Sequence, residues 1–102
     1  MKIFVDFDGV ICKSEGIPTR KFIWEEREPV EDAHDAIHFL IKQGHKITIF
    51  TSNPEPEEVK NWLRDHFFPE MEVTNIKSFA HVYIDDRGLR FTNWQDIRRY
   101  FG

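Results

Sequence analysis

The stretch KIFVDFDG at residues 2–9 is a short, almost unbroken run of apolar and β-branched side chains that ends in Asp-x-Asp-Gly. Such a run is typical of a central parallel strand, because burial on both faces removes the alternation of polar and apolar residues. Asp6 and Asp8 place two carboxylates at the end of this strand, and Gly9 favours a turn after them. We therefore expect a central strand whose carboxyl end carries functional groups.

Helical and strand patterns alternate through the rest of the chain. Pro29 precedes apolar residues at helical spacing, and Gly44 is suited to end that helix, which we predict approximately at residues 31–43. Further elements are predicted as strands at 45–51, 71–74 and 82–84, an edge strand at 89–91, a helix that buries Val59, Trp62, Leu63 and Phe67, and a last helix capped by Asn93 with Trp94, Ile97 and Phe101 on one face. The pattern predicts an α/β fold, with a Rossmann-like parallel sheet and helices on both faces.

The length of 102 residues predicts a single domain, residues 1–102, without room for a separate cap domain. Residues 9–28 show no periodicity and contain Gly16 and Pro18, so we expect a loop or flap there. The lone Cys12 lies in an apolar context and is expected in the core.

The overall charge and hydropathy exclude some classes of function. A formal net charge of −4 argues against broad binding of nucleic acids, which leaves a nucleic acid only as a substrate. No apolar run approaches the length of a membrane span, and the first residues lack the order of a signal peptide. We expect a cytoplasmic protein that does not bind membranes.

Acidic side chains end two of the predicted strands, Asp6 and Asp8 the first and Asp85 and Asp86 a later one. Four carboxylates at one edge of a sheet repel each other unless a cation lies between them. Oxygen ligands without a Cys or His pair favour Mg²⁺, which often binds one or two carboxylates together with a substrate phosphate. The pattern therefore predicts a Mg²⁺ site and a phosphorylated substrate.

Polar and basic residues accompany these acids. Thr51 and Ser52 follow the second predicted strand, and Lys77 precedes the strand that ends in the second acid pair. Their hydroxyl and ammonium groups are candidates to bind the phosphoryl oxygens, on which negative charge accumulates during transfer. In the alternative interpretation, Thr51 caps the following helix and Lys77 is a solvated loop residue.

Residues 4–10 (FVDFDGV) resemble the first motif of the haloacid dehalogenase (HAD) superfamily of phosphohydrolases. Thr51 in IFTS is similar to the second motif, Lys77 in NIK to the third, and residues 82–86 (VYIDD) to the acidic fourth motif. The resemblance covers nearly the whole chain and its motifs fall in the right order. It implies a small HAD core without a cap domain.

The resemblance also implies roles for these residues. Asp6 would attack phosphorus to give an aspartyl-phosphate, and Asp8 would act as general acid and then as general base. Mg²⁺ would be held by the Asp6 carboxylate, the Asp8 carbonyl and either Asp85 or Asp86. Because an acid stands at position 8, phosphate ester hydrolysis is favoured over dehalogenation.

Several alternatives stay open at this level. The strand-end acids could simply form turns. Arg20, Lys21, Trp24 and Arg27 could bind a nucleotide or sugar phosphate, or could belong to a flap that packs its aromatic residues down. A site without a cap is either open to large substrates or closed by homo-oligomerisation.

The competing functions are a polynucleotide or nucleotide phosphatase within the same superfamily, a phospho-accepting signalling receiver, and a phosphate-binding protein without turnover. His34 and His38 are spaced as two helical metal ligands, but no third ligand is evident, so solvated histidines are the favoured interpretation.

Overall fold

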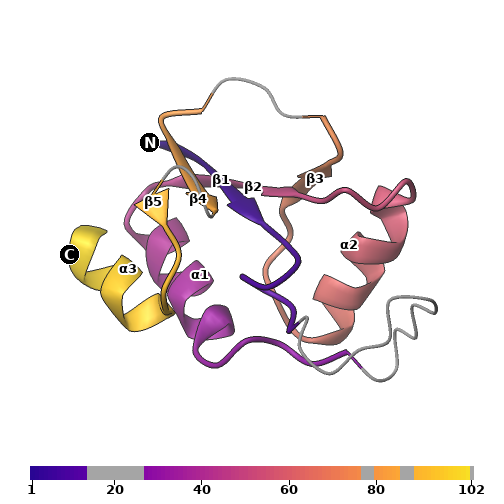
Figure 1. Ribbon diagram of the computed structural model, residues 1–102, viewed down its shortest axis with the longest axis horizontal. Helices are drawn as coiled ribbons and strands as arrows, with labels where there is room; N and C mark the ends of the chain where they lie inside the picture. The colour runs from indigo at the N-terminus through magenta and orange to yellow at the C-terminus, as the bar shows by residue number, and fades with distance from the viewer. Residues whose placement is uncertain (14–26, 77–79, 86–88, 102) are drawn as a thin grey trace.

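A computed structural model describes residues 1–13, 27–76, 80–85 and 89–101 (Figure 1). Within these ranges the chain forms five strands and three helices. In chain order they are β1 (Lys2–Asp6), α1 (Ala33–Lys42), β2 (Lys46–Phe50), α2 (Pro56–Asp65), β3 (Glu72–Thr74), β4 (Val82–Asp85), β5 (Leu89–Arg90) and α3 (Trp94–Phe101). The alternation of strands and helices confirms the predicted α/β class.

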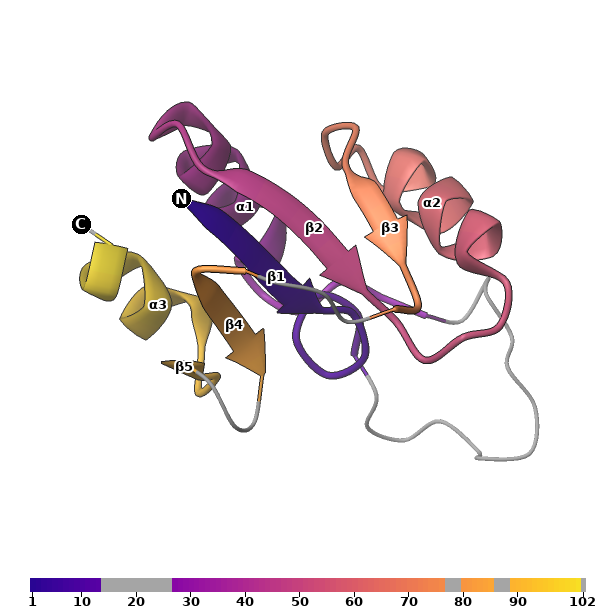
Figure 2. The same cartoon turned by 90° about the horizontal axis from the view of Figure 1, so that it is seen from above.

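The strands form one sheet in the order β3-β2-β1-β4-β5, and every pairing between neighbours is parallel. Figure 2 shows the strands next to one another in this order. β1 lies in the centre, as its unbroken apolar run predicts, and β5 is an edge strand of two residues. The order reverses between β1 and β4, and such a switch point is where α/β sheets usually bind ligands.

Two helix termini follow the predicted capping signals. α1 ends at Lys42 and is followed by Gly44, which has a φ of +92° and donates its N–H to the Ile41 carbonyl at 3.0 Å. At the start of α3, the Asn93 side chain accepts a hydrogen bond from the Asp96 N–H at 2.9 Å. The predicted caps are therefore confirmed at both helices.

The end of α2 differs from the prediction. The helix stops at Asp65, and Phe67 adopts a φ of +64° while its N–H bonds the Arg64 carbonyl at 3.0 Å. This left-handed residue reverses the chain, so that Phe68 is buried and Phe67 is 81% exposed. The prediction that Phe67 belongs to the buried face was wrong, because the position lies beyond the helical period.

All three described helices cover one face of the sheet. Their buried side chains pack with the alternate strand residues Ile3, Val5, Ile49 and Ile84 in one hydrophobic core. Buried residues from each helix belong to it, among them Ala33, Ala36, Ile37 and Leu40 of α1, Val59, Trp62 and Leu63 of α2, and Trp94 and Ile97 of α3. Cys12 is also buried in this core, as predicted.

The opposite face has no helix among the described residues, so the prediction of helices on both faces is wrong for this part of the chain. Phe4 and Thr48 point to this face and are buried outside the main core. The crossovers from β1 to β2 and from β2 to β3 run in the same direction, and right-handed connections then place both helices on one face. The return from β3 to β4 is a short connection, in which Ala80 donates its N–H to the Tyr83 hydroxyl at 3.1 Å.

No described helix combines the length and the apolar character that a membrane crossing requires. The cytoplasmic location stays a prediction.

Candidate active site at the carboxyl ends of the strands

A tight turn follows β1 and fixes the main chain around Asp8. The Phe7 carbonyl accepts hydrogen bonds from the N–H groups of residues 10, 11 and 12, at 3.4, 3.0 and 2.9 Å. Gly9 has a φ of +78°, which is left-handed and suits glycine, and its N–H bonds the Cys12 carbonyl at 2.7 Å. Asp8 is therefore held on a rigid loop directly beyond the strand.

Asp6 and Asp85 are brought together by the register of the sheet. The β1–β4 pairing places Val5 opposite Ile84. The next residue of each strand is an aspartate, Asp6 in β1 and Asp85 in β4. Because adjacent strands lie about 4.8 Å apart, these two residues are neighbours at the switch point. Asp85, one of the predicted metal-binding residues, is only 3% exposed and lies in a nearly dry environment.

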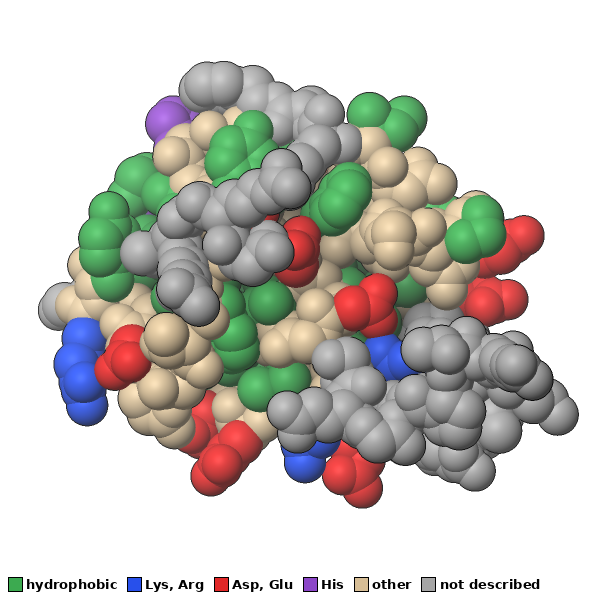
Figure 3. All heavy atoms as spheres, viewed as in Figure 1, with side chains coloured by type: hydrophobic (Ala, Val, Ile, Leu, Met, Phe, Trp, Pro, Cys, Tyr) green, Lys and Arg blue, Asp and Glu red, His purple; other side chains and the backbone are tan. Residues whose placement is uncertain are grey.

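Figure 3 looks onto the edge at which the strands end. Acidic side chains are visible near the centre of this face, and a basic side chain lies close to one of them. The described part of the site is thus acidic, which suits a cation better than a bare anion.

Asp8 forms an ion pair that the sequence did not indicate. Its Oδ1 accepts a hydrogen bond from Nη2 of Arg27 at 2.7 Å. The Arg27 side chain is 6% exposed and that of Asp8 is 46% exposed. Nε of Arg27 also donates to Sγ of Cys12 at 3.1 Å. Arg27 therefore contacts the protein, and the alternative in which it binds the substrate is not supported.

The thiol of Cys12 lies beneath this ion pair. Burial raises the pKa of Cys12 above its ordinary value, while the hydrogen bond and the charge of Arg27 lower it and the charge of Asp8 raises it further. Burial is the largest of these effects. A buried thiol with a raised pKa is a poor nucleophile, so Cys12 has a packing and hydrogen-bonding role.

Thr51 directly follows β2 and is 2% exposed. Its N–H bonds the Thr74 carbonyl at 3.0 Å, and its Oγ1 accepts the Asn53 N–H at 3.1 Å. The side chain therefore stabilises the loop after β2 and does not cap α2, which begins at Pro56. Ser52 is exposed beside it.

Two of the predicted site residues, Lys77 and Asp86, lie outside the described residues. Arg20, Lys21 and Trp24 of the predicted flap lie outside them as well. The ends of this flap are described, and they are paired: Cys12 and Pro29 form an antiparallel bridge, and the Lys13 N–H donates to the Glu28 carbonyl at 2.8 Å.

The metal prediction depends on Asp6, Asp8 and Asp85 in this part of the chain. No three His, Cys, Asp or Glu side chains form a metal-binding cluster among the described residues, which leave out Asp86. Mg²⁺ commonly takes one or two carboxylates and completes its shell with water and phosphate oxygens. The donor chemistry of the neighbouring Asp6 and Asp85 is therefore compatible with this ion. His34, by contrast, lies near the Phe67 carbonyl, with 2.7 Å between Nε2 and the oxygen.

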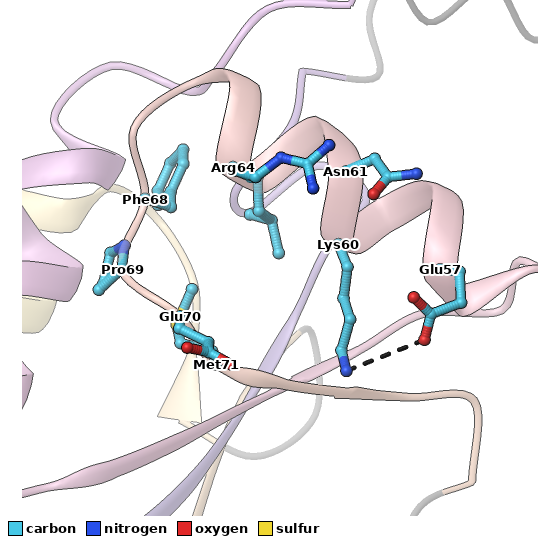
Figure 4. A pocket seen from close by; sticks show the side chains of 9 residues that line it. Glu57, Lys60, Asn61, Arg64, Phe68, Pro69, Glu70 and Met71 are labelled. Carbon is cyan, nitrogen blue, oxygen red and sulfur yellow. Dashed lines mark ion pairs between the residues drawn. The ribbon is translucent and has the colours of Figure 1, made fainter.

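A separate pocket of about 300 Å³ lies between α2 and the segment that follows it (Figure 4). Its lining combines the buried Leu63, Phe68 and Met71 with charged residues at the rim, where Lys60 and Glu57 form an ion pair at 3.9 Å. None of the predicted site residues lines it. The pocket is therefore separate from the candidate site at the strand ends.

Comparisons with protein-family models, with curated proteins and with solved structures found no match. The HAD character of the core accordingly stays a prediction. The arrangement of Asp6, Asp8 and Asp85 is an observation of this structure. Arg27 was considered only as a possible substrate ligand, and its ion pair with Asp8 was not predicted, since no sequence spacing links the two residues.

Proposed function

We propose that this protein is a Mg²⁺-dependent phosphatase of the HAD type, which hydrolyses a phosphate monoester through an aspartyl-phosphate. The observation that supports it most is the placement of Asp6 and Asp85 side by side at the switch point, with Asp8 held on the adjoining turn. Carboxylates at the switch point of a parallel sheet lie where such folds usually bind ligands, and their oxygens are suited to bind a cation and to act on a substrate.

The proposed reaction has two steps. A carboxylate oxygen of Asp6 forms a bond to phosphorus while the bond to the ester oxygen breaks, and Asp8 gives its proton to that leaving oxygen. Asp8 then takes a proton from a water molecule, which attacks the phosphorus of the aspartyl-phosphate and releases inorganic phosphate and the Asp6 carboxylate. Bound Mg²⁺ would offset the negative charge of the phosphoryl group and of the carboxylates.

The proposed holders of the ion are the Asp6 carboxylate, the Asp8 carbonyl and the acid pair that begins with Asp85. Thr51, Ser52 and Lys77 are the proposed ligands of the phosphoryl oxygens. Thr51 and Ser52 follow β2, which is parallel to β1 and next to it, so they lie at the same edge of the sheet as Asp6. Their hydroxyl groups are suited to donate to oxygens that gain charge.

The strand order bears on one competing function. Signalling receivers have the flavodoxin-like order 2-1-3-4-5, whereas this chain has the order 3-2-1-4-5. The receiver alternative is therefore not favoured. A polynucleotide or nucleotide ester stays the alternative substrate, and its basic contacts would come from residues other than Arg27.

The test is a panel of phosphate esters assayed with Mg²⁺, which includes nucleotides, sugar phosphates, phosphopeptides and oligonucleotides phosphorylated at either end. Asp6→Asn removes the nucleophile and should abolish turnover. Asp35→Asn makes the same change at an exposed position of α1 and should leave turnover at the wild-type level. Release of phosphate by Asp6→Asn at the wild-type rate would contradict the mechanism, and an inactive wild type on the whole panel would contradict the function.

A further inference from the structure

The guanidinium of Arg27 is the nearest described cation to the proposed acid/base, and it is buried. It uses one edge for two contacts, Nη2 to Oδ1 of Asp8 at 2.7 Å and Nε to Sγ of Cys12 at 3.1 Å. The first contact is a short, charge-assisted hydrogen bond, which is stronger and more directional than a neutral one. The second contact fixes the rotation of the guanidinium plane. Together they hold one oxygen of Asp8 in a defined place.

The main chain of Arg27 is itself held from two sides. Its carbonyl accepts a hydrogen bond from Nε1 of Trp62 in α2 at 3.3 Å. The next residues pair with the loop after β1, because the Val30 N–H donates to the Ile11 carbonyl at 2.8 Å. Trp62 also packs edge-on against Phe7, with ring centroids 5.2 Å apart. The loop that carries Asp8 and the segment that carries Arg27 are therefore packed together and against α2.

A substrate contact does not account for this arrangement, because the Arg27 side chain is 6% exposed and turned toward protein atoms. Stability alone is also a poor explanation. The pair has one buried and one half-exposed partner, so the cost of removing Arg27 from water offsets much of its attraction to the screened Asp8 carboxylate, and the presence of the pair needs a further reason. The reason offered by the geometry is orientation of the Asp8 carboxylate.

We infer that Arg27 is the positioning residue for Asp8, and this inference rests on the proposed phosphatase function. By engaging Oδ1, Arg27 leaves Oδ2 as the atom that exchanges a proton with the leaving group and then with water. The rotation of the carboxylate about its Cβ–Cγ bond is thereby restricted before the substrate binds. Arg27 does not touch the reacting atoms.

The inference is tested by the dependence of turnover on the leaving group. An alkyl phosphate needs protonation of its leaving oxygen, whereas 4-nitrophenyl phosphate leaves as a stable anion and needs little help. Arg27→Met keeps an unbranched apolar stem, shorter than arginine, and removes both hydrogen bonds. We expect kcat to fall about 100-fold on the alkyl phosphate, the loss that a misplaced catalytic group can cause. On 4-nitrophenyl phosphate we expect a fall of less than about 3-fold, because general acid catalysis contributes little there.

Arg64→Met is the matched control, since Arg64 is an exposed arginine of α2 and the same change there should alter neither rate. Arg27→Lys restores a positive charge but cannot bridge Oδ1 and Sγ with one planar group, so an intermediate loss on the alkyl phosphate is expected. This variant carries the same test if Arg27→Met does not fold, and circular dichroism establishes which variants fold.

The outcomes separate the two proposals. Equal losses on both esters in a folded Arg27 variant overturn the positioning role and leave the phosphatase function standing. A wild-type protein that hydrolyses neither ester, nor any other of the panel, overturns the function and the positioning role with it. A loss confined to the alkyl phosphate supports both, because a merely structural defect would lower the two rates alike.

Discussion

Replacing Asp8 by alanine removes the carboxylate that faces the buried guanidinium of Arg27. Two unit charges about 4 Å apart attract by about 4 kcal/mol at an effective dielectric constant of about 20. The Asp8 side chain is 46% exposed, so water screens the pair, and we discount this value by half. We expect Asp8→Ala to lower the free energy of unfolding by about 2 kcal/mol, which corresponds to roughly 10 °C in Tm for a domain of this size.

Further variants separate the contributions to this loss of stability. Asp8→Asn keeps an oxygen that can accept from Nη2 and should cost about 1 kcal/mol, since only the charge is lost. In the double variant Asp8→Ala with Arg27→Met, the methionine removes the buried charge that faced Asp8, and part of the stability returns. Urea unfolding followed by tryptophan fluorescence gives the four free energies of this cycle. The coupling should be about 1–2 kcal/mol.

Additive effects within about 0.3 kcal/mol would refute this reasoning, because they would mean that the two side chains do not interact in solution. The cycle also has a practical consequence for activity measurements. Asp8→Ala removes the carboxylate that faces a buried cation, so a loss of activity in this variant would combine lost chemistry with lost stability. Asp8→Asn is the better variant for the kinetics.

Two further predictions concern the metal site and the end of α2. Mg²⁺ at about ten times its dissociation constant should stabilise the wild type by about 1.4 kcal/mol. In a thermal shift assay, Asp85→Asn should remove most of this gain. An equal gain in both proteins would exclude Asp85 as a ligand. Phe67→Gly should raise the free energy of unfolding by about 0.5–1 kcal/mol, because Phe67 is 81% exposed and left-handed, and urea unfolding with lowered stability would count against this.

Much of the fold followed from local patterns in the sequence. The apolar run of β1, the glycine that ends α1 and the asparagine that begins α3 each act within a few residues, so a single sequence reveals them. The face of the sheet on which the helices pack could not be predicted from these local patterns. Which face a helix occupies depends on the direction of the whole crossover, and the connection between β3 and β4 contributes no described helix.

The candidate site shows the same division. Asp6, Asp8 and Asp85 were predicted because the ends of parallel strands meet at one edge, whatever the details of the loops. The ion pair between Asp8 and Arg27 was not predicted. The position of Arg27 depends on its contact with Trp62 and on the pairing of the flap ends, which local sequence patterns do not reveal. Phe67 was misplaced for a similar reason: one left-handed residue shifts the apolar period by one position.

The all-parallel sheet also has a consequence for how the protein is made. β1 has neighbours only from far along the chain, with Lys2 opposite Lys46 and Ile3 opposite Val82. Sheets built from such distant pairings fold slowly, and during synthesis one edge of β1 stays open until the segment around Val82 has left the ribosome. Until then Asp6 has no Asp85 beside it. This edge of the sheet is therefore completed late, and until then β1 has one unpaired edge, which is a site for aggregation.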